Sequence, residues 1–263
     1  MGKWRMAPFV IGLAAAALLL SAGGCSLGSP PDPNDPEAVG ELQPEVIQRN
    51  LARAANALQE RVLRGELTDQ ERNEYLTHYA EKLTQSVDVA RIKPEQAWRY
   101  ADAFRTARMW DRAIPIYETA LEWARRENDV DRIVNDSLRL AQCLAHTGKA
   151  KEAIELARGT FEVAPKDKAP ILMSVLYEIV PPLEGKSVDR ELAQLVEEAI
   201  GQHLQVVVDV DSPSGQAFVG AKVIHVRKAW QKVIELHQAA GDDLAAKKAA
   251  ERADQALSHQ AVL

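Results

Sequence analysis

The pattern of apolar and polar positions changes its character along the chain. Residues 9–20 are almost all apolar, whereas from residue 44 onward apolar side chains recur every three or four positions. The second pattern has the period of an amphipathic helix with one face turned to a core. Pro44 suits a first helical position and Gly65 suits a helix end. We therefore expect residues 44–263 to form an all-α domain.

A second helix start is visible shortly after Gly65. Thr68 is followed three residues later by Glu71, which is the spacing of a capping box. In that arrangement the threonine hydroxyl and the glutamate carboxylate each satisfy a backbone N–H at the helix end. The sequence therefore predicts a helix that begins at about residue 69.

An apolar frame recurs three times after Pro94. Each copy has a run of large and small apolar residues, and an alanine follows the last residue of that run after nine positions. The last residue of each run and its alanine are Phe104 with Ala113, Leu144 with Ala153, and His237 with Ala246. In the last two copies a glycine, Gly148 or Gly241, precedes the alanine by five residues. Small residues let two antiparallel helices approach closely, and glycine allows a tight turn between them.

This frame resembles the tetratricopeptide repeat (TPR), which pairs a W-x-x-L-G-x-x-Y half with an A-x-x-x-F half. The resemblance implies antiparallel helix-pair repeats stacked into a TPR-like α-solenoid. The alanine markers are 40 and 93 residues apart, whereas the family period is about 34 residues. The middle units are therefore expected to be degenerate, with one such pair at residues 169–180 and 188–204.

Residues 205–211 fit two structures. Their run of valines is typical of a strand, and the sequence after Ser212 would suit a hairpin turn. A helix that is interrupted at Ser212-Pro213 fits the flanking helices better, and we favour it.

The amino-terminal residues have the three parts of a secretory signal. Lys3 and Arg5 form a basic end, residues 9–20 form the apolar part, and small residues at 21–24 precede Cys25. Small residues that end at a cysteine resemble the lipobox of bacterial lipoproteins. The resemblance implies cleavage of residues 1–24 and acylation of Cys25, which anchors the chain to a membrane. Residues 25–43 then form a proline-rich tether.

Two other interpretations of this leader stay open. Ala22 occupies the position where the lipobox usually has leucine, and small residues also suit the ordinary signal peptidase. The apolar run of residues 7–24 is alternatively an uncleaved anchor at the short limit for a membrane span.

Composition and charge exclude several classes of protein. The chain has 46% hydrophobic and 27% charged residues, which is too apolar for a disordered protein. Its net charge is −6 without a basic patch, so we expect no nucleic-acid partner. If Cys25 carries lipid, Cys143 is the one remaining cysteine and an internal disulfide is excluded.

The sequence offers little for catalysis. None of its six histidines lies in an H-E-x-x-H pair or near a second cysteine, so we expect no metal. The glycine fingerprints of nucleotide-binding loops and the G-x-S-x-G elbow are absent, so we expect no cofactor and no enzymatic activity. Cys143 is interpreted as a small buried apolar residue rather than as a reactive thiol.

One face of the predicted inner helices is a candidate recognition surface. Trp98 lies one residue away from the large-residue position of the frame, and Asp102 and Arg105 follow it one and two turns later. The equivalent face of the next pair carries Leu138, Gln142 and His146. The alternative is that Trp98 packs against the preceding helix. The Lys and Asn pattern of the TPR carboxylate clamp is absent, so binding of chaperone tails is not implied.

These features predict a non-catalytic, lipid-anchored envelope protein whose repeat domain binds another envelope protein or peptide. Repeat arrays present extended concave surfaces that suit such partners. A small-ligand or glycan-binding lipoprotein is the alternative, and a pocket with an aromatic floor would favour it. Ser26 after the cysteine favours the periplasmic face of the outer membrane in a cell with two membranes.

Overall fold

The computed structural model describes residues 43–166 and 171–260. The predicted signal peptide, Cys25 and the predicted tether up to residue 42 lie outside these ranges, as does the start of the predicted degenerate pair at 169–170. Within the described ranges, no helix combines the length and the apolar character that crossing a membrane requires.

The described part of the chain is all-helical, with ten α-helices and no strand, which confirms the predicted all-α class. The first six helices are α1 (Pro44–Leu63), α2 (Asp69–Thr84), α3 (Ala97–Thr106), α4 (Trp110–Arg126), α5 (Val130–His146) and α6 (Ala150–Val163). The remaining four are α7 (Ile171–Ser174), α8 (Asp189–Leu204), α9 (Pro213–Ala239) and α10 (Asp243–Gln260). Short 3₁₀ turns are η1 (Val89–Arg91), η2 (Pro94–Gln96) and η4 (Pro181–Leu183), and a π-helical turn, η3 (Val175–Ile179), continues α7.

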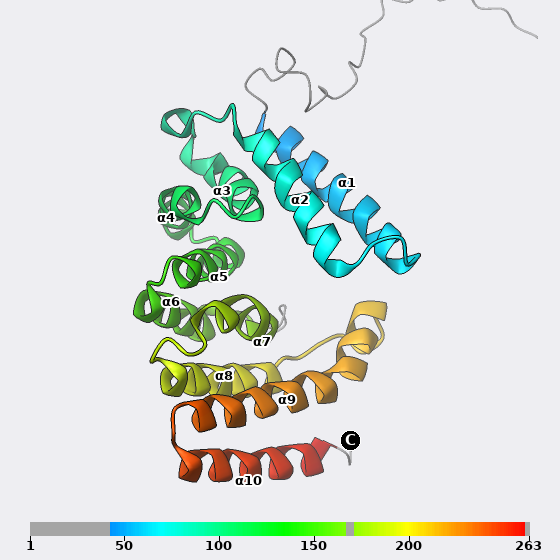
Figure 1. Ribbon diagram of the computed structural model, residues 1–263, viewed down its shortest axis with the longest axis vertical. Coiled ribbons are helices and arrows are strands. Elements are labelled where there is room, and N and C mark those ends of the chain that lie inside the picture. The colour runs from blue at the N-terminus through cyan, green and yellow to red at the C-terminus, as the bar shows by residue number, and fades with distance from the viewer. Residues whose placement is uncertain (1–42, 167–170, 261–263) are drawn as a thin grey trace, which may run out of the picture.

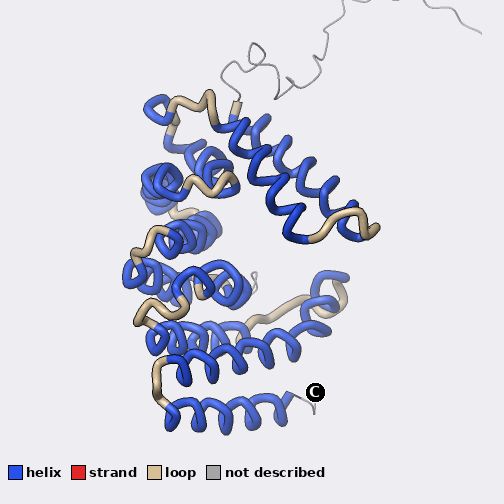
Figure 2. Tube along the Cα trace, in the orientation of Figure 1, coloured by secondary structure: helices blue, strands red, loops and turns tan. Residues whose placement is uncertain are grey.

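The helices pack mainly against their neighbours in the chain. Figure 1 shows them stacked in order from α1 to α10, with α4 on α5, α5 on α6 and α8 on α9. On one side of the stack α5 contacts both α3 and η3. The α1–α2 hairpin and the first turns of α9 extend beyond the stack on the same side (Figure 2). One continuous core, made largely of alanine, leucine, isoleucine and valine, runs through the stack.

Both predicted helix starts are confirmed. Pro44 is the first residue of α1. Thr68 caps α2 with both hydrogen bonds of the capping box, since its hydroxyl accepts from the Glu71 N–H and the Glu71 carboxylate accepts from the Thr68 N–H at 2.8 Å. These contacts involve only residues that are close in sequence, which is why the sequence was sufficient to predict them.

Five connections between helices close with the same backbone geometry. In each, one residue with positive φ donates its N–H to the carbonyl three residues back, and the next residue donates to the carbonyl five residues back. This pair of bonds is the Schellman motif. The positive-φ residues, with their φ angles, are Gly65 (72°), Arg108 (55°), Asn128 (53°), Gly148 (80°) and Gly241 (70°). The predicted turn glycines are confirmed, and Arg108 occupies the same place before Ala113 although it has a side chain.

The nine-residue step joins two buried positions in all three copies of the frame. Phe104 and Ala113 are fully buried, and Leu144 and Ala153 are no more than 5% exposed. His237 and Ala246 are buried in the same way at the α9–α10 pair. The recurring pattern in the sequence therefore marks helix contacts that recur in the structure.

The prediction for residues 205–211 was wrong, because the segment is neither helix nor strand. α8 ends at Leu204, and α9 begins at Pro213 with Ser212 as its N-cap. The Asp209 carbonyl accepts from the Ser212 hydroxyl at 2.7 Å and closes the segment onto the helix start. Gly215 permits this, since a Cβ at that position would lie 1.8 Å from the Asp209 carbonyl oxygen.

Candidate functional site

Asp102 is the centre of a charged cluster between α3, α4 and α5. Arg105, one turn later on α3, donates from Nη2 to Asp102 Oδ1 at 2.7 Å. The Tyr117 hydroxyl of α4 donates to the same oxygen at 3.2 Å. Arg139 of α5 places Nη1 3.5 Å from it. One carboxylate oxygen therefore connects three helices.

The environment keeps Asp102 ionised. Burial by itself would raise the pKa of Asp102, but the charges of Arg105 and Arg139 outweigh it, and the pKa is lowered. The same burial raises the pKa of Tyr117 well above its ordinary value, so Tyr117 stays a neutral donor. Arg105 also donates from Nη1 to the Gln142 Oε1 at 3.0 Å, which extends the cluster along α5.

Trp98 lies one turn before Asp102 and is stacked with arginine side chains. The guanidinium carbon of Arg132 is 3.8 Å from the centroid of the indole, and that of Arg99 is 4.5 Å from it. Arg132 also pairs with Asp136. Asp136 is 1% exposed, and burial raises its pKa despite this partner. Trp98 is half-buried, packs with part of its ring against the hydrophobic core, and is held by these cation–π contacts.

The other two predicted residues, Leu138 and His146, have different surroundings. Leu138 is 7% exposed and belongs to the core. His146 is exposed and stacks on Trp110, with ring centroids 4.1 Å apart and planes inclined by 1°. The structure thus joins Asp102, Arg105 and Gln142 by hydrogen bonds, whereas the role of all six residues in binding a partner stays a prediction.

Sequence reasoning missed Tyr117, Arg132 and Arg139. A signal for the two arginines was present, because residues 132, 136 and 139 are spaced by four and three positions and so share one helix face. Tyr117 gave no such signal, since its hydroxyl reaches Asp102 only when α4 folds back on α3.

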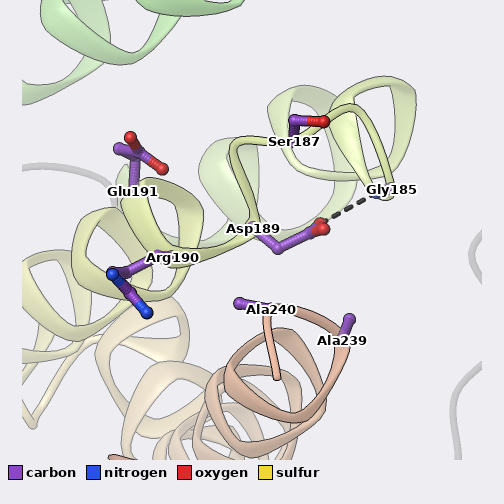
Figure 3. A pocket seen from close by; sticks show the side chains of 7 residues that line it. All are labelled: Gly185, Ser187, Asp189, Arg190, Glu191, Ala239 and Ala240. Carbon is purple, nitrogen blue, oxygen red and sulfur yellow. Dashed lines mark hydrogen bonds between the residues drawn. The ribbon is translucent and has the colours of Figure 1, made fainter. Parts of the chain in front are cut away.

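A pocket of about 580 Å³ lies at another place in the stack (Figure 3). It is formed by the turn before α8, the first turn of α8 and the end of α9. Its lining residues are Gly185, Ser187, Asp189, Arg190, Glu191, Ala239 and Ala240. The Asp189 carboxylate accepts from the Gly185 N–H at 2.8 Å, and Arg190 pairs with Asp242 at 3.3 Å. Trp98 does not line this pocket, whose walls carry no aromatic ring.

Cys143 is fully buried beside the Asp102 cluster. Burial raises the pKa of its thiol to about 12, so it is protonated at neutral pH. This agrees with its interpretation as a small apolar residue. Among the residues that the structure describes, no group of three or more histidine, cysteine, aspartate or glutamate side chains is placed to hold a metal ion.

Comparisons with known proteins add little to this picture. No protein-family model matches the sequence, and no curated protein does. One similar solved structure is the crystal structure of BtubC (BKLC) from P. vanneervenii, with 13% sequence identity and a TM-score of 0.42. The match covers 82% of this chain and 91% of that one. A likeness of this size carries no argument about function, which has to be inferred from the residues themselves.

Proposed function

We propose that the described helices form a TPR-like α-solenoid that binds a protein or peptide partner, on a chain anchored in the cell envelope through Cys25. The solenoid is supported by the five identical turns and by the nine-residue step with buried ends. The anchor is supported by the lipobox resemblance of the residues before Cys25. Repeat arrays of this kind are suited to binding extended segments.

The observation that carries the proposed binding is that charged side chains on α3 and α5 are partly exposed and are held in place by partners within the chain. We call Trp98, Asp102, Arg105, Arg132, Arg139 and Gln142 the α3–α5 strip. The side chains of its three arginines are 17–30% exposed, so each still presents part of its surface to solvent. Each is also held by a partner within the chain.

Side chains that are ordered before binding lose less entropy when a partner arrives. Tryptophan and arginine are also the residues that most often dominate binding energy at interfaces. The three arginines pair with Asp102 and Asp136, and the carboxylate of Glu178 also acts on Arg105. Because guanidinium groups carry hydrogen-bond donors and no acceptor, the strip favours a partner segment that presents backbone carbonyls or a carboxylate.

The test is recovery of a partner from crosslinked envelopes. Trp98→Ala and Arg105→Ala should each reduce a specific partner at least about tenfold, the loss that corresponds to about 1.4 kcal/mol. Arg126→Ala is the control, because Arg126 lies exposed in the last turn of α4 and is not one of the strip residues. Circular dichroism should show unchanged helix content in all three variants. A partner that is recovered equally with every variant would show that the strip does not bind it.

The anchor is tested independently of the strip. Cells given a fatty-acid analogue should label the wild-type protein, and Cys25→Ser should lose the label. Undiminished label on that variant, or none on the wild type, contradicts acylation at Cys25 and leaves the binding proposal untouched.

A further inference from the structure

His203 in the last turn of α8 is buried in an unusual way. Its side chain is fully covered, yet within the part of the chain that the structure describes neither ring nitrogen has a hydrogen-bond partner. Its ring packs against two side chains of α9, with centroid distances of 5.1 Å to Phe218 and 5.9 Å to His225. An imidazole in this place is tolerated only as a neutral ring, because a buried charge without a partner is costly.

Among the described residues, two ionisable groups act on His203. Both lie on α9, and both are positively charged when protonated. They are Lys222, whose amine donates to the Leu204 carbonyl at 3.1 Å, and His225, whose Nδ1 is buried without a hydrogen-bond partner among the described residues. A proton added to His203 would therefore enter a covered site and meet further positive charge. Neither contribution stabilises the imidazolium.

We propose that His203 makes the junction between α8 and α9 acid-sensitive. The junction consists of the last turn of α8, residues 205–212 and α9 as far as Val226. Protonation of His203 favours a state in which the first turns of α9 have separated from α8 and the ring has reached water. This proposal goes beyond the proposed function and depends neither on the anchor nor on the α3–α5 strip.

The direction of the pH dependence follows from the pKa. Burial first, and then His225 and Lys222, lower the pKa of His203 from its ordinary value of 6.5 to about 4. The separated state therefore binds the proton more tightly than the closed state. The closed junction is most stable above pH 6.5, and it loses stability as the pH falls from 6.5 to about 4.

Opening of the junction would enlarge an apolar surface that is already partly exposed. Val210, Val219 and Ile224 are 50–59% exposed in the closed junction, whereas Val206 is buried at 7%. The Val207 N–H is held by the Lys166 carbonyl at 2.8 Å. Separation of α9 from α8 would also uncover Val206 and Phe218. Acid would therefore enlarge the small apolar patch that these exposed residues form in the closed junction.

Hydrogen exchange with peptide resolution tests the proposal on the purified protein. Protection factors are corrected for the pH dependence of intrinsic exchange. For residues 205–226 they should fall about twentyfold between pH 7 and pH 5. This is the change expected when the pKa of His203 is 6.5 in the open state and about 4 in the closed state. Protection of α3 and α4 should not change over this range. His203→Phe should remove most of the effect, since both nitrogens lack partners and an apolar ring loses no hydrogen bond. His78→Gln is the control for an exposed histidine and should behave like the wild type.

Three results of the exchange experiment would overturn the proposal. They are constant protection in the wild type, an equal fall in His203→Phe, and a fall that is the same in every helix. If the phenylalanine variant does not fold, His203→Leu takes its place. The proton resonances of His203 in the wild type then give its pKa directly, and a value above 6 would contradict the inference.

Discussion

The contact between Gly215 and the Asp209 carbonyl gives the sharpest prediction for stability. In an ordinary helix interior, replacement of glycine by alanine stabilises by about 1 kcal/mol, because alanine has the higher helix propensity. At Gly215 the added Cβ would lie 1.8 Å from the Asp209 oxygen and 2.7 Å from its carbonyl carbon. Both atoms are backbone and cannot move away as the end of a flexible side chain would.

Overpacking of this kind costs about 1–3 kcal/mol. Gly215→Ala should therefore be destabilising by up to about 2 kcal/mol once the propensity gain of about 1 kcal/mol is subtracted. Gly220→Ala is the matched control, since Gly220 lies in the same helix and its Cβ would meet nothing within 4 Å. That variant should be stabilising by about 1 kcal/mol.

Thermal unfolding followed by circular dichroism measures both variants. For a domain of this size each kcal/mol corresponds to about 2–4 °C in Tm, so the two variants should shift Tm in opposite directions. Limited proteolysis within residues 205–215 should be faster in Gly215→Ala only. Shifts of the same sign in both variants would refute the assigned contact between the carbonyl and the helix start.

The recurrent turn predicts that Arg108→Gly raises Tm, because relief of a left-handed backbone in a residue with a side chain is worth about 1 kcal/mol. Gly148→Ala should lower Tm by a similar amount, since its φ is 80°. The added Cβ would meet nothing within 4 Å, so backbone strain alone accounts for the loss. Two variants that both keep the Tm of the wild type would contradict the shared geometry. Asp102→Asn should make the free energy of unfolding fall less steeply as the pH is lowered. The folded state lowers the pKa of Asp102 from its ordinary value of 3.8. The ionised carboxylate therefore contributes stability above pH 3.8, and this contribution is lost as the pH falls through the lower pKa of the folded state. Urea unfolding midpoints from pH 7 to pH 3 measure this, and an unchanged acid limb would argue against the ion pairs. Cys143 should not react with a thiol reagent at pH 8 until the protein unfolds, because burial raises its pKa to about 12; rapid labelling of the native protein would contradict that burial.

The sequence predicted those parts of the fold that depend on local contacts. The capping box at Thr68 and the turn at Gly148 involve residues within a few positions of one another, so their chemistry is visible in the chain itself. Arg108 shows the limit of this reasoning. Its turn is the same as that at Gly148, but an arginine gives no local signal for the left-handed region, which residues with a Cβ rarely adopt.

The candidate site was predicted in part for the same reason. The spacing of Asp102 and Arg105 indicated a shared helix face, which the structure confirms through their ion pair. What covers that face was not predictable, because Tyr117 and Arg139 reach Asp102 from two other helices. The contact of His203 with α9 likewise joins residues of different helices, so the spacing of residues along the chain does not predict it.

The packing of each helix mainly on its near neighbours has a mechanical consequence. A force applied at residue 43, where the proposed tether would enter, reaches α1 first, and the main contacts of α1 are with α2 and α3 alone. Such a stack yields by peeling, one hairpin after another, because the main contacts of the described helices are with near neighbours in the chain. We therefore expect extension curves with several small force peaks rather than one large rupture. With the proposed anchor, a protein of this build would lengthen under load and recover its shape when the load is removed.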